Sequence, residues 1–305
     1  MIAILNGFGR SLGDGIIGLQ ALHAAIQVGA VRSRPVLFRL PDLPVMVQAL
    51  YAAADFAEIR PLPWEFASTE RRFDPGDGFA GVIDLRDFAF DPDFQQTAMI
   101  DFFLRRLGVP PDSVPAAWRR NGWLASRVMA QTEFPPGYLL VCPQASMRLR
   151  DMPDAVHAHI LRRALAVGPV LTQGAVPDGL GGEVIQTPPC KTLVALCGLV
   201  RNARLVISTD TAMIHLAAAF SVPCLAFFPT HRPQWRVRDY PQCLSVALSS
   251  RLPPGIEFAR GPGDDALARS SWFPHGDDFG WLDHAIAQAL ETFDRAEPGL
   301  ATAAY

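Results

Sequence analysis

The sequence lacks the excess of basic residues that bulk nucleic acid or anionic lipid attracts. It has 27 basic and 30 acidic residues, and its formal net charge is −3. A polybasic coat is therefore excluded, although a local basic groove is not. Half of the chain is hydrophobic and 19% is charged, so the chain can bury real cores and is not a disordered protein.

Paired cysteines and long apolar runs are also missing. The five cysteines form no C-x-x-C pair and sit in apolar runs, so we expect buried, reduced thiols rather than a disulfide framework or a zinc site. The longest apolar stretch, residues 213–228, contains His215 and Pro223 and is too short to span a bilayer. The start of the chain has no signal-peptide layout. We therefore expect a soluble cytoplasmic protein.

Short β-rich runs alternate with helical patterns along the chain, which is typical of an α/β protein with parallel sheets. Predicted strands cover residues 2–6, 36–40, 58–62, 81–85, 138–142, 169–172, 183–185, 205–208 and 224–228. Predicted helices cover residues 16–26, 44–53, 91–107, 153–166, 191–202, 211–220 and 281–293, and residues 250–280 are expected to form loop.

The 305 residues correspond to about two domains. Residues 110–137 contain several prolines and few strand signals. We therefore predict an N-terminal domain over residues 1–130 and a C-terminal domain over 131–305, with the helix at 281–293 as a candidate to pack back on the N-terminal domain. Two Rossmann-like halves would place a ligand in the cleft between them, at the carboxyl ends of both sheets.

Residues 208–216 carry the strongest local signal. They follow a buried strand and open a helix, so free backbone N–H groups and the positive end of the helix dipole predict an anion site. Thr211 and His215 are four residues apart and share one helix face, where they can offer a hydroxyl and an imidazole N–H to a phosphate. Asp210 can cap the helix. The alternative is an ordinary strand-to-helix turn with a core-facing histidine.

Residues 11–14, Ser-Leu-Gly-Asp, follow the first strand. Glycines allow a sharp turn and a close approach of a ligand, and an acid at the mouth of a cleft makes Asp14 a candidate general base. The alternative is a glycine turn with Asp14 as a helix cap. The glycine spacing is one residue too long for a dinucleotide-binding fingerprint, and the lysine of a phosphate-binding P-loop is missing.

Residues 143–153 follow the first strand of the second half. Ser146 could bond a phosphate oxygen, and Arg148 or Arg150 could supply positive charge to it. The alternative is a solvated arginine loop.

Taken in this order, the segments resemble glycosyltransferase family 9, the ADP-heptose heptosyltransferases. Residues 10–16, 82–86 and 101–108 match the family patterns N-S-L-G-D-x-I/V, V-I-D-L-x and D-x-F-L-x-x-L-G. Residues 143–153, 210–223 and 228–233 resemble P-G-A-S-x-x-x-K-x-W-P, D-S/T-G-x-x-H-L-A-A-A-x-x-x-P and F-G-P-T-D-P. The resemblance covers about residues 1–240, and residues 210–223 are its most specific part.

The resemblance implies an α/β protein of the GT-B fold, with two Rossmann-like domains facing across a cleft. The C-terminal domain would bind the nucleotide-sugar and the N-terminal domain the acceptor, with no metal and no cofactor other than the ADP-heptose co-substrate. The expected activity is inverting transfer of heptose to a lipopolysaccharide core or another surface glycan. The expected location is the cytoplasm, with peripheral contact to the inner membrane, and nucleic acid is not expected as a partner.

The resemblance also assigns site residues. Asp14 stands where the family has its general base, and Arg150 where it has a phosphate-binding lysine. The phosphates of the nucleotide-sugar would be held by Ser146, Arg150, Asp210, Thr211, Ala212 and His215. Candidates for contacts with the acceptor or the base are Arg10, Ser11, Gly13, Arg232, Trp235 and Arg236.

Several positions depart from the family pattern. Gln144 and Ala212 replace glycines, and Met152 replaces a tryptophan. Val194 lies about where the family has a ribose-binding glutamate. Pro229 and His231 interrupt the F-G-P-T-D-P loop. These departures keep two other hypotheses open, a catalytically impaired GT-B protein that binds a nucleotide-sugar or glycan, and another GT-B enzyme such as a sugar-nucleotide epimerase.

Overall fold

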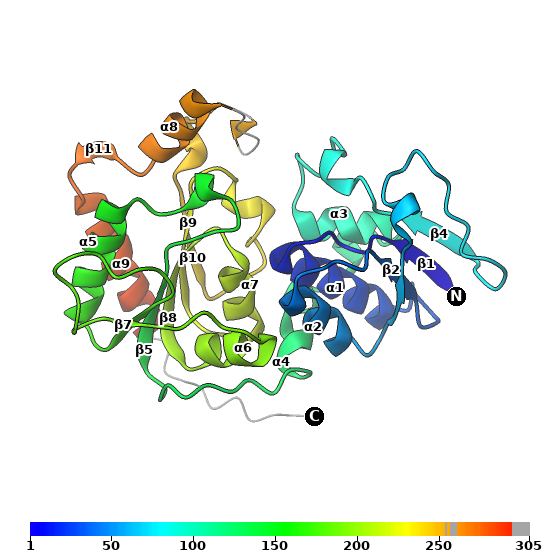
Figure 1. Ribbon diagram of the computed structural model, residues 1–305, viewed down its shortest axis with the longest axis horizontal. Coiled ribbons are helices and arrows are strands. Elements are labelled where there is room, and N and C mark those ends of the chain that lie inside the picture. Colours follow the sequence, from blue (N-terminus) through cyan, green and yellow to red (C-terminus); the bar gives the residue numbers. More distant parts are fainter. Residues whose placement is uncertain (254, 257–260, 295–305) are drawn as a thin grey trace.

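A computed structural model describes residues 1–253, 255–256 and 261–294, and it contains two parallel sheets that lie side by side (Figure 1). The N-terminal sheet has the order β3-β2-β1-β4. Its strands are β1 (Ile2–Leu5), β2 (Val36–Arg39), β3 (Glu58–Pro61) and β4 (Gly81–Asp84). The helices of this half are α1 (Leu12–Gln27), α2 (Val45–Ala53) and α3 (Met99–Arg106), followed by the short α4 (Gly122–Ala125).

The C-terminal sheet has the order β10-β9-β8-β5-β6-β7. Its strands are β5 (Tyr138–Cys142), β6 (Val170–Thr172), β7 (Ile185–Gln186), β8 (Ala203–Thr209), β9 (Cys224–Phe228) and β10 (Cys243–Ala247). The helices are α5 (Asp154–Leu165), α6 (Leu193–Arg201), α7 (Ala212–Ala219), α8 (Pro262–Ser270) and α9 (Gly280–Asp294). A short strand, β11 (Pro274–Asp277), lies outside both sheets. The predicted α/β class with parallel sheets is therefore confirmed.

The buried strands were the easiest elements to predict, because strands covered on both faces form continuous apolar runs. β5 and β9, for example, are buried at every position. Elsewhere the structure differs from the prediction. The helix expected over residues 91–107 is reduced to α3, since residues 92–97 form turns and a bend. Residues 250–280, expected as loop, contain α8 and β11, and residues 243–247 form β10, where no element was predicted.

The final helix lies on the C-terminal sheet. α9 packs against α5 and β9, and its Leu282 and Ile286 are buried in one cluster with Phe227 and Trp272. Its expected return to the N-terminal half is therefore wrong, because its apolar face is already covered by the C-terminal sheet.

The two halves share a continuous apolar core. α1 packs on α7 and α2 packs on α6, and the largest cluster of buried apolar residues contains side chains of both halves, including Ile16 and Leu216. An ion pair adds to this contact, because Nη1 and Nη2 of Arg238 lie 2.7 and 2.8 Å from the two carboxylate oxygens of Asp101. The N-terminal sheet ends with β4 and the C-terminal sheet begins with β5, and the proposed boundary near residue 130 falls between these two strands.

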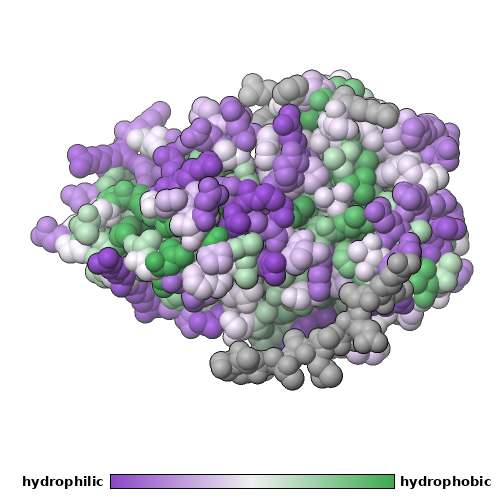
Figure 2. Space-filling model, turned by 180° about the vertical axis from the view of Figure 1, so that it is seen from behind, coloured by the Kyte–Doolittle hydropathy of each residue, from purple (hydrophilic) through white to green (hydrophobic). Residues whose placement is uncertain are grey.

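Polar side chains cover much of the surface of both halves. Figure 2 shows them in purple on the face behind that of Figure 1, with smaller apolar areas between them. Among the described residues, no helix is long and apolar enough to cross a membrane.

Gly18 on α1 allows the glycine-rich turn after β1 to pack on the helix. A Cβ atom at Gly18 would lie 2.0 Å from Cγ of Phe8. We therefore expect Gly18→Ala to lower the free energy of unfolding by about 2 kcal/mol, despite the better helix propensity of alanine, as measured by urea denaturation. Gly122→Ala, where a Cβ would meet nothing within 4 Å, is the control and should be close to neutral. Equal stabilities of the two variants would contradict this packing.

Candidate active site

A cavity of about 850 Å³ lies between the two halves. Both halves contribute site residues predicted from the sequence. From the N-terminal half they are Arg10, Ser11, Gly13 and Asp14, and from the C-terminal half Ser146, Arg150, Asp210, Thr211, Ala212, His215, Trp235 and Arg236. Arg232 is exposed and does not line the cavity; its guanidinium lies 5.2 Å from the ring centroid of Trp235. The proposed grip of Arg232 on a ligand therefore finds no support in its position.

A buried arginine fixes the backbone of the turn that leads to Asp14. Arg39, only 3% exposed, donates to the carbonyl oxygens of Asn6, Gly7 and Gly9. Its guanidinium lies 3.8 Å from the ring centroid of Tyr51, whose hydroxyl donates to Gly7 O at 2.7 Å. In the part of the chain that the structure describes, no carboxylate pairs with Arg39, so carbonyl dipoles and an aromatic face solvate its charge.

These contacts of Arg39 and Tyr51 stabilise an unusual backbone conformation in the turn. Asn6 and Phe8 both have positive φ angles, of 56° and 62°, and such residues persist only where the surroundings fix them. Gly9, with φ of 79°, has no room for a side chain, because a Cβ would lie 2.9 Å from Phe88 and 3.3 Å from Oδ2 of Asp14. The turn therefore places the carboxylate of Asp14 at the cavity wall.

α1 and α7, whose starts line the cavity, each begin at a side-chain cap. Ser11 accepts from Asp14 N at 3.1 Å and starts α1. Thr211 accepts from Met213 N at 3.1 Å and starts α7. The cap of α7 is thus Thr211, and the expectation that Asp210 caps it is wrong, because Asp210 lies one residue earlier and pairs with basic side chains instead.

Asp210 is a buried carboxylate with two partners. Its Oδ2 accepts from Nδ1 of His231 at 2.8 Å and from Nη1 of Arg150 at 3.1 Å. Burial alone would raise the pKa of Asp210, but the hydrogen bond from His231 and the charges of His231, Arg150 and Arg236 hold it far below its usual range. In the sequence, His231 stands out only as a departure from the family pattern. Its hydrogen bond with Asp210 gives a structural reason for a histidine at this position.

Arg150 rather than Arg148 reaches the cavity. Arg150 Nη2 donates to Ser146 Oγ at 3.0 Å, whereas Arg148 is exposed and outside the cavity wall. Burial and the charge of Arg236 lower the pKa of His231, and Asp210 opposes them. The Arg150 guanidinium and the start of α7 suit an anion.

His215 lies where the starts of the two helices meet. A Cβ at Gly13 would lie 3.3 Å from Cδ2 and 3.6 Å from Nε2 of His215, and 3.8 Å from the Cα of Ala212. Only a glycine on α1 lets α7 approach this closely without displacement. Burial lowers the pKa of His215 to about 4, opposed by Asp210 and reinforced by Arg236 and Arg150, so the ring is neutral near pH 7.

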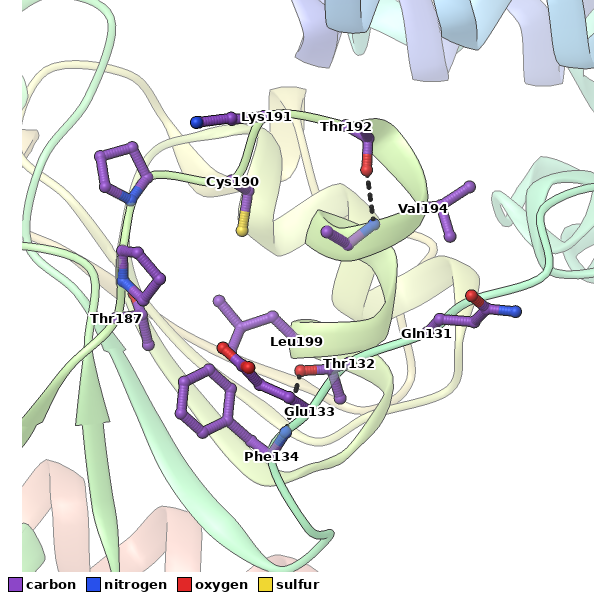
Figure 3. A pocket seen from close by; sticks show the side chains of 13 residues that line it. Gln131, Thr132, Glu133, Phe134, Thr187, Cys190, Lys191, Thr192, Val194 and Leu199 are labelled. Atoms are coloured by element: carbon purple, nitrogen blue, oxygen red, sulfur yellow. Dashed lines mark hydrogen bonds between the residues drawn. The ribbon is translucent and has the colours of Figure 1, made fainter.

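The residues that depart from the family pattern lie in different parts of the structure. Gln144 and Ala212 line the cavity, whereas Met152 is 4% exposed and belongs to the C-terminal core. Val194, expected near a ribose site, lies outside the main cavity. It lines a second one of about 490 Å³, together with Lys191 and Glu133 (Figure 3). The two cavities adjoin at Cys190, which lines both.

Among the described residues, no group of three or more histidine, cysteine, aspartate or glutamate side chains is placed to hold a metal ion. The five cysteines are unpaired thiols.

The buried neutral His215 makes stability depend on pH. Its unfolded form binds a proton near pH 6.5 and its folded form only near pH 4, so the unfolded state binds more protons between these values and stability falls as the pH falls. We expect this residue to account for about 2 kcal/mol of the loss in unfolding free energy between pH 7 and pH 5. In urea denaturation, the unfolding free energy of His215→Gln should fall by about 2 kcal/mol less between pH 7 and pH 5 than that of the unchanged chain. An identical loss in both would contradict a neutral His215.

The family model described as glycosyltransferase family 9 (heptosyltransferase) matches residues 179–253. This range contains α7 with Thr211 and His215, and also His231 and Tyr240. No curated protein matches the sequence.

Solved structures match over almost the whole chain. ADP-heptose lps heptosyltransferase II of E. coli is 12% identical, with a TM-score of 0.61 over 96% of this chain and 99% of that chain. E. coli heptosyltransferase WaaC with ADP-2-deoxy-2-fluoro heptose is 14% identical, with a TM-score of 0.56 over 96% and 99%. The iron-containing dodecameric glycosyltransferase TibC of enterotoxigenic E. coli H10407 is 13% identical, with a TM-score of 0.61 over 97% and 76%.

At these identities the structural matches establish the fold, and the family model adds a sequence match in the C-terminal half. The resemblance predicted from the motifs is therefore confirmed: the chain has the two-domain GT-B fold of the heptosyltransferases and carries the sequence pattern of glycosyltransferase family 9 around α7.

Proposed function

We propose that this protein is an inverting glycosyltransferase that moves a sugar from a nucleoside diphosphate donor to a glycan acceptor. One observation carries the proposal: Asp14 from the N-terminal half and the start of α7 from the C-terminal half line the same cavity. A carboxylate and an anion site on one cavity are what a single displacement needs, since the carboxylate removes a proton and the anion site receives a leaving diphosphate.

Asp14 is the general base in this mechanism. Its carboxylate takes the proton of an acceptor hydroxyl while that oxygen attacks the anomeric carbon of the donor sugar. The bond between the anomeric carbon and the diphosphate oxygen breaks on the opposite side, so the configuration is inverted. Arg39 and Tyr51 support this role indirectly, because they hold the turn that positions Asp14.

The leaving diphosphate gains charge as the glycosidic bond breaks. The start of α7, the Arg150 guanidinium and the neutral imidazole of His215 are the groups that stabilise it. Because these groups can neutralise the charge without a metal ion, we propose a metal-independent transfer. Solved heptosyltransferases with the same fold include complexes with ADP and with an ADP-heptose analogue, which supports ADP-heptose as the donor.

The proposed acceptor is a lipopolysaccharide core or another surface glycan, which follows from the family resemblance and from the name of E. coli heptosyltransferase II. The proposed place of action is the cytoplasm beside the inner membrane, where such an acceptor is assembled.

Asp14→Asn should abolish transfer while keeping donor binding. The amide keeps the shape of the side chain but cannot accept the proton, so we expect turnover to fall about 100-fold or more. Transfer from ADP-heptose to a heptose-deficient core and the Kd for ADP, by calorimetry, are the two measurements. Asp42→Asn, at an exposed acid outside the cavity wall, is the control with unchanged turnover.

The same assay separates the two functional hypotheses. Full turnover of Asp14→Asn would remove Asp14 from the mechanism. An unchanged chain that binds ADP but transfers no sugar to any core acceptor would favour the impaired binding protein instead.

Arg150→Ala should weaken nucleotide binding. The variant removes the guanidinium beside Ser146 and leaves Asp210 with less compensation, so we expect the Kd for ADP to rise about tenfold or more in calorimetry. Arg148→Ala, two residues earlier and exposed outside the cavity, is the matched control with an unchanged Kd. Equal effects of the two variants would place the phosphates elsewhere.

A further inference from the structure

A buried chain of hydrogen bonds reaches His215 from the side away from the cavity. Asn121, 1% exposed, lies in the segment between the two sheets, and Tyr240 lies in the loop between β9 and β10. Asn121 Nδ2 is 2.6 Å from the Tyr240 hydroxyl, which is 2.9 Å from Nδ1 of His215. Neither Asn121 nor Tyr240 belongs to any family motif recognised in the sequence.

The backbone carbonyl oxygen of His215 determines which groups donate and which accept in this series of hydrogen bonds. A carbonyl can only accept, and Asn121 Nδ2 donates to it at 3.3 Å. The amide nitrogen therefore faces both His215 O and Tyr240, since the reversed amide would set two carbonyl oxygens against each other. Asn121 donates to the Tyr240 oxygen, and the hydroxyl proton of Tyr240 is left to point at His215.

Tyr240 then donates to Nδ1 of His215. Burial raises the pKa of Tyr240 above its ordinary value, so its hydroxyl keeps the proton that it donates. An acceptor nitrogen carries no proton, and a neutral imidazole must then carry its proton on Nε2. The Nε2 edge is the one next to Gly13 at the start of α1, and both Gly13 and His215 line the cavity.

We propose that Asn121 and Tyr240 are positioning residues that fix His215 as the Nε2–H tautomer, with a permanent hydrogen-bond donor directed to the cavity. A neutral donor can bond an oxygen of the diphosphate without exchanging a proton with solvent. That last step rests on the proposed function, whereas the tautomer itself does not.

The tautomer can be measured without any substrate. Long-range ¹H–¹⁵N correlation spectra of the full chain labelled with ¹⁵N-histidine distinguish the two tautomers, and the His215→Gln variant identifies the His215 signals among the seven histidines. We expect Nε2–H for the unchanged chain at pH 7. In Tyr240→Phe, which lacks the donor, we expect a mixture of tautomers.

Asn121→Asp tests the direction of these hydrogen bonds in a second way. A carboxylate at this position accepts from Tyr240, whose oxygen must then accept from His215, so the tautomer should switch to Nδ1–H. Tyr138→Phe is the matched control, because Tyr138 is also buried but its hydroxyl donates to Leu199 O at 2.6 Å. That variant should leave the His215 signals unchanged.

ADP titration then connects the tautomer to binding. We expect the Kd for ADP to rise about tenfold in Tyr240→Phe and to stay unchanged in Tyr138→Phe. An Nδ1–H tautomer in the unchanged chain, or no change of tautomer in Tyr240→Phe, would overturn the proposal even if ADP binds. The expected tautomers without any ADP binding would leave the positioning role intact and contradict the proposed function.

Discussion

The structure depends on the close packing of two helix starts that come from different halves of the chain. α1 can approach α7 because Gly13 has no side chain to meet His215. This contact places the carboxylate of Asp14 and the capped start of α7 on one cavity. A glycine in the Ser-Leu-Gly-Asp segment is therefore needed for packing between the halves, and not only for the turn that the sequence suggested.

Buried charge is handled differently on the two sides of the cavity. Arg39 on the N-terminal side is surrounded by carbonyl oxygens and the Tyr51 ring. The contacts that solvate its buried charge therefore also fix one conformation of the turn. On the C-terminal side Asp210 is compensated by Arg150 and His231. A buried carboxylate with two partners keeps its charge over a wide pH range, which maintains the shape of that wall.

Local patterns in the sequence predicted much of the fold and the polar residues that line the cavity, but not its apolar lining, such as Met46, Phe88 and Met99. Buried strands such as β5 and β9 are continuous apolar runs. The helix caps were not predicted, because Ser11 and Thr211 accept the capping hydrogen bonds where the sequence had suggested Asp14 and Asp210. Residues 91–93 have the cap and early proline of a helix start, but residues 92–97 form turns and a bend, and Phe94 packs on Phe88 and Phe102. Asn121, Tyr240 and Arg39 belong to no pattern, since their roles exist only once distant segments meet.

The apolar core that passes from one half to the other has a consequence for how this fold can change shape. Two Rossmann-like units joined only by a linker could separate as rigid bodies, but here such a movement would expose the buried faces of α1 and α7 to water and break the Arg238–Asp101 pair. The shared core therefore opposes a separation of the two halves as rigid bodies, because that separation would lose buried apolar contact and an ion pair together.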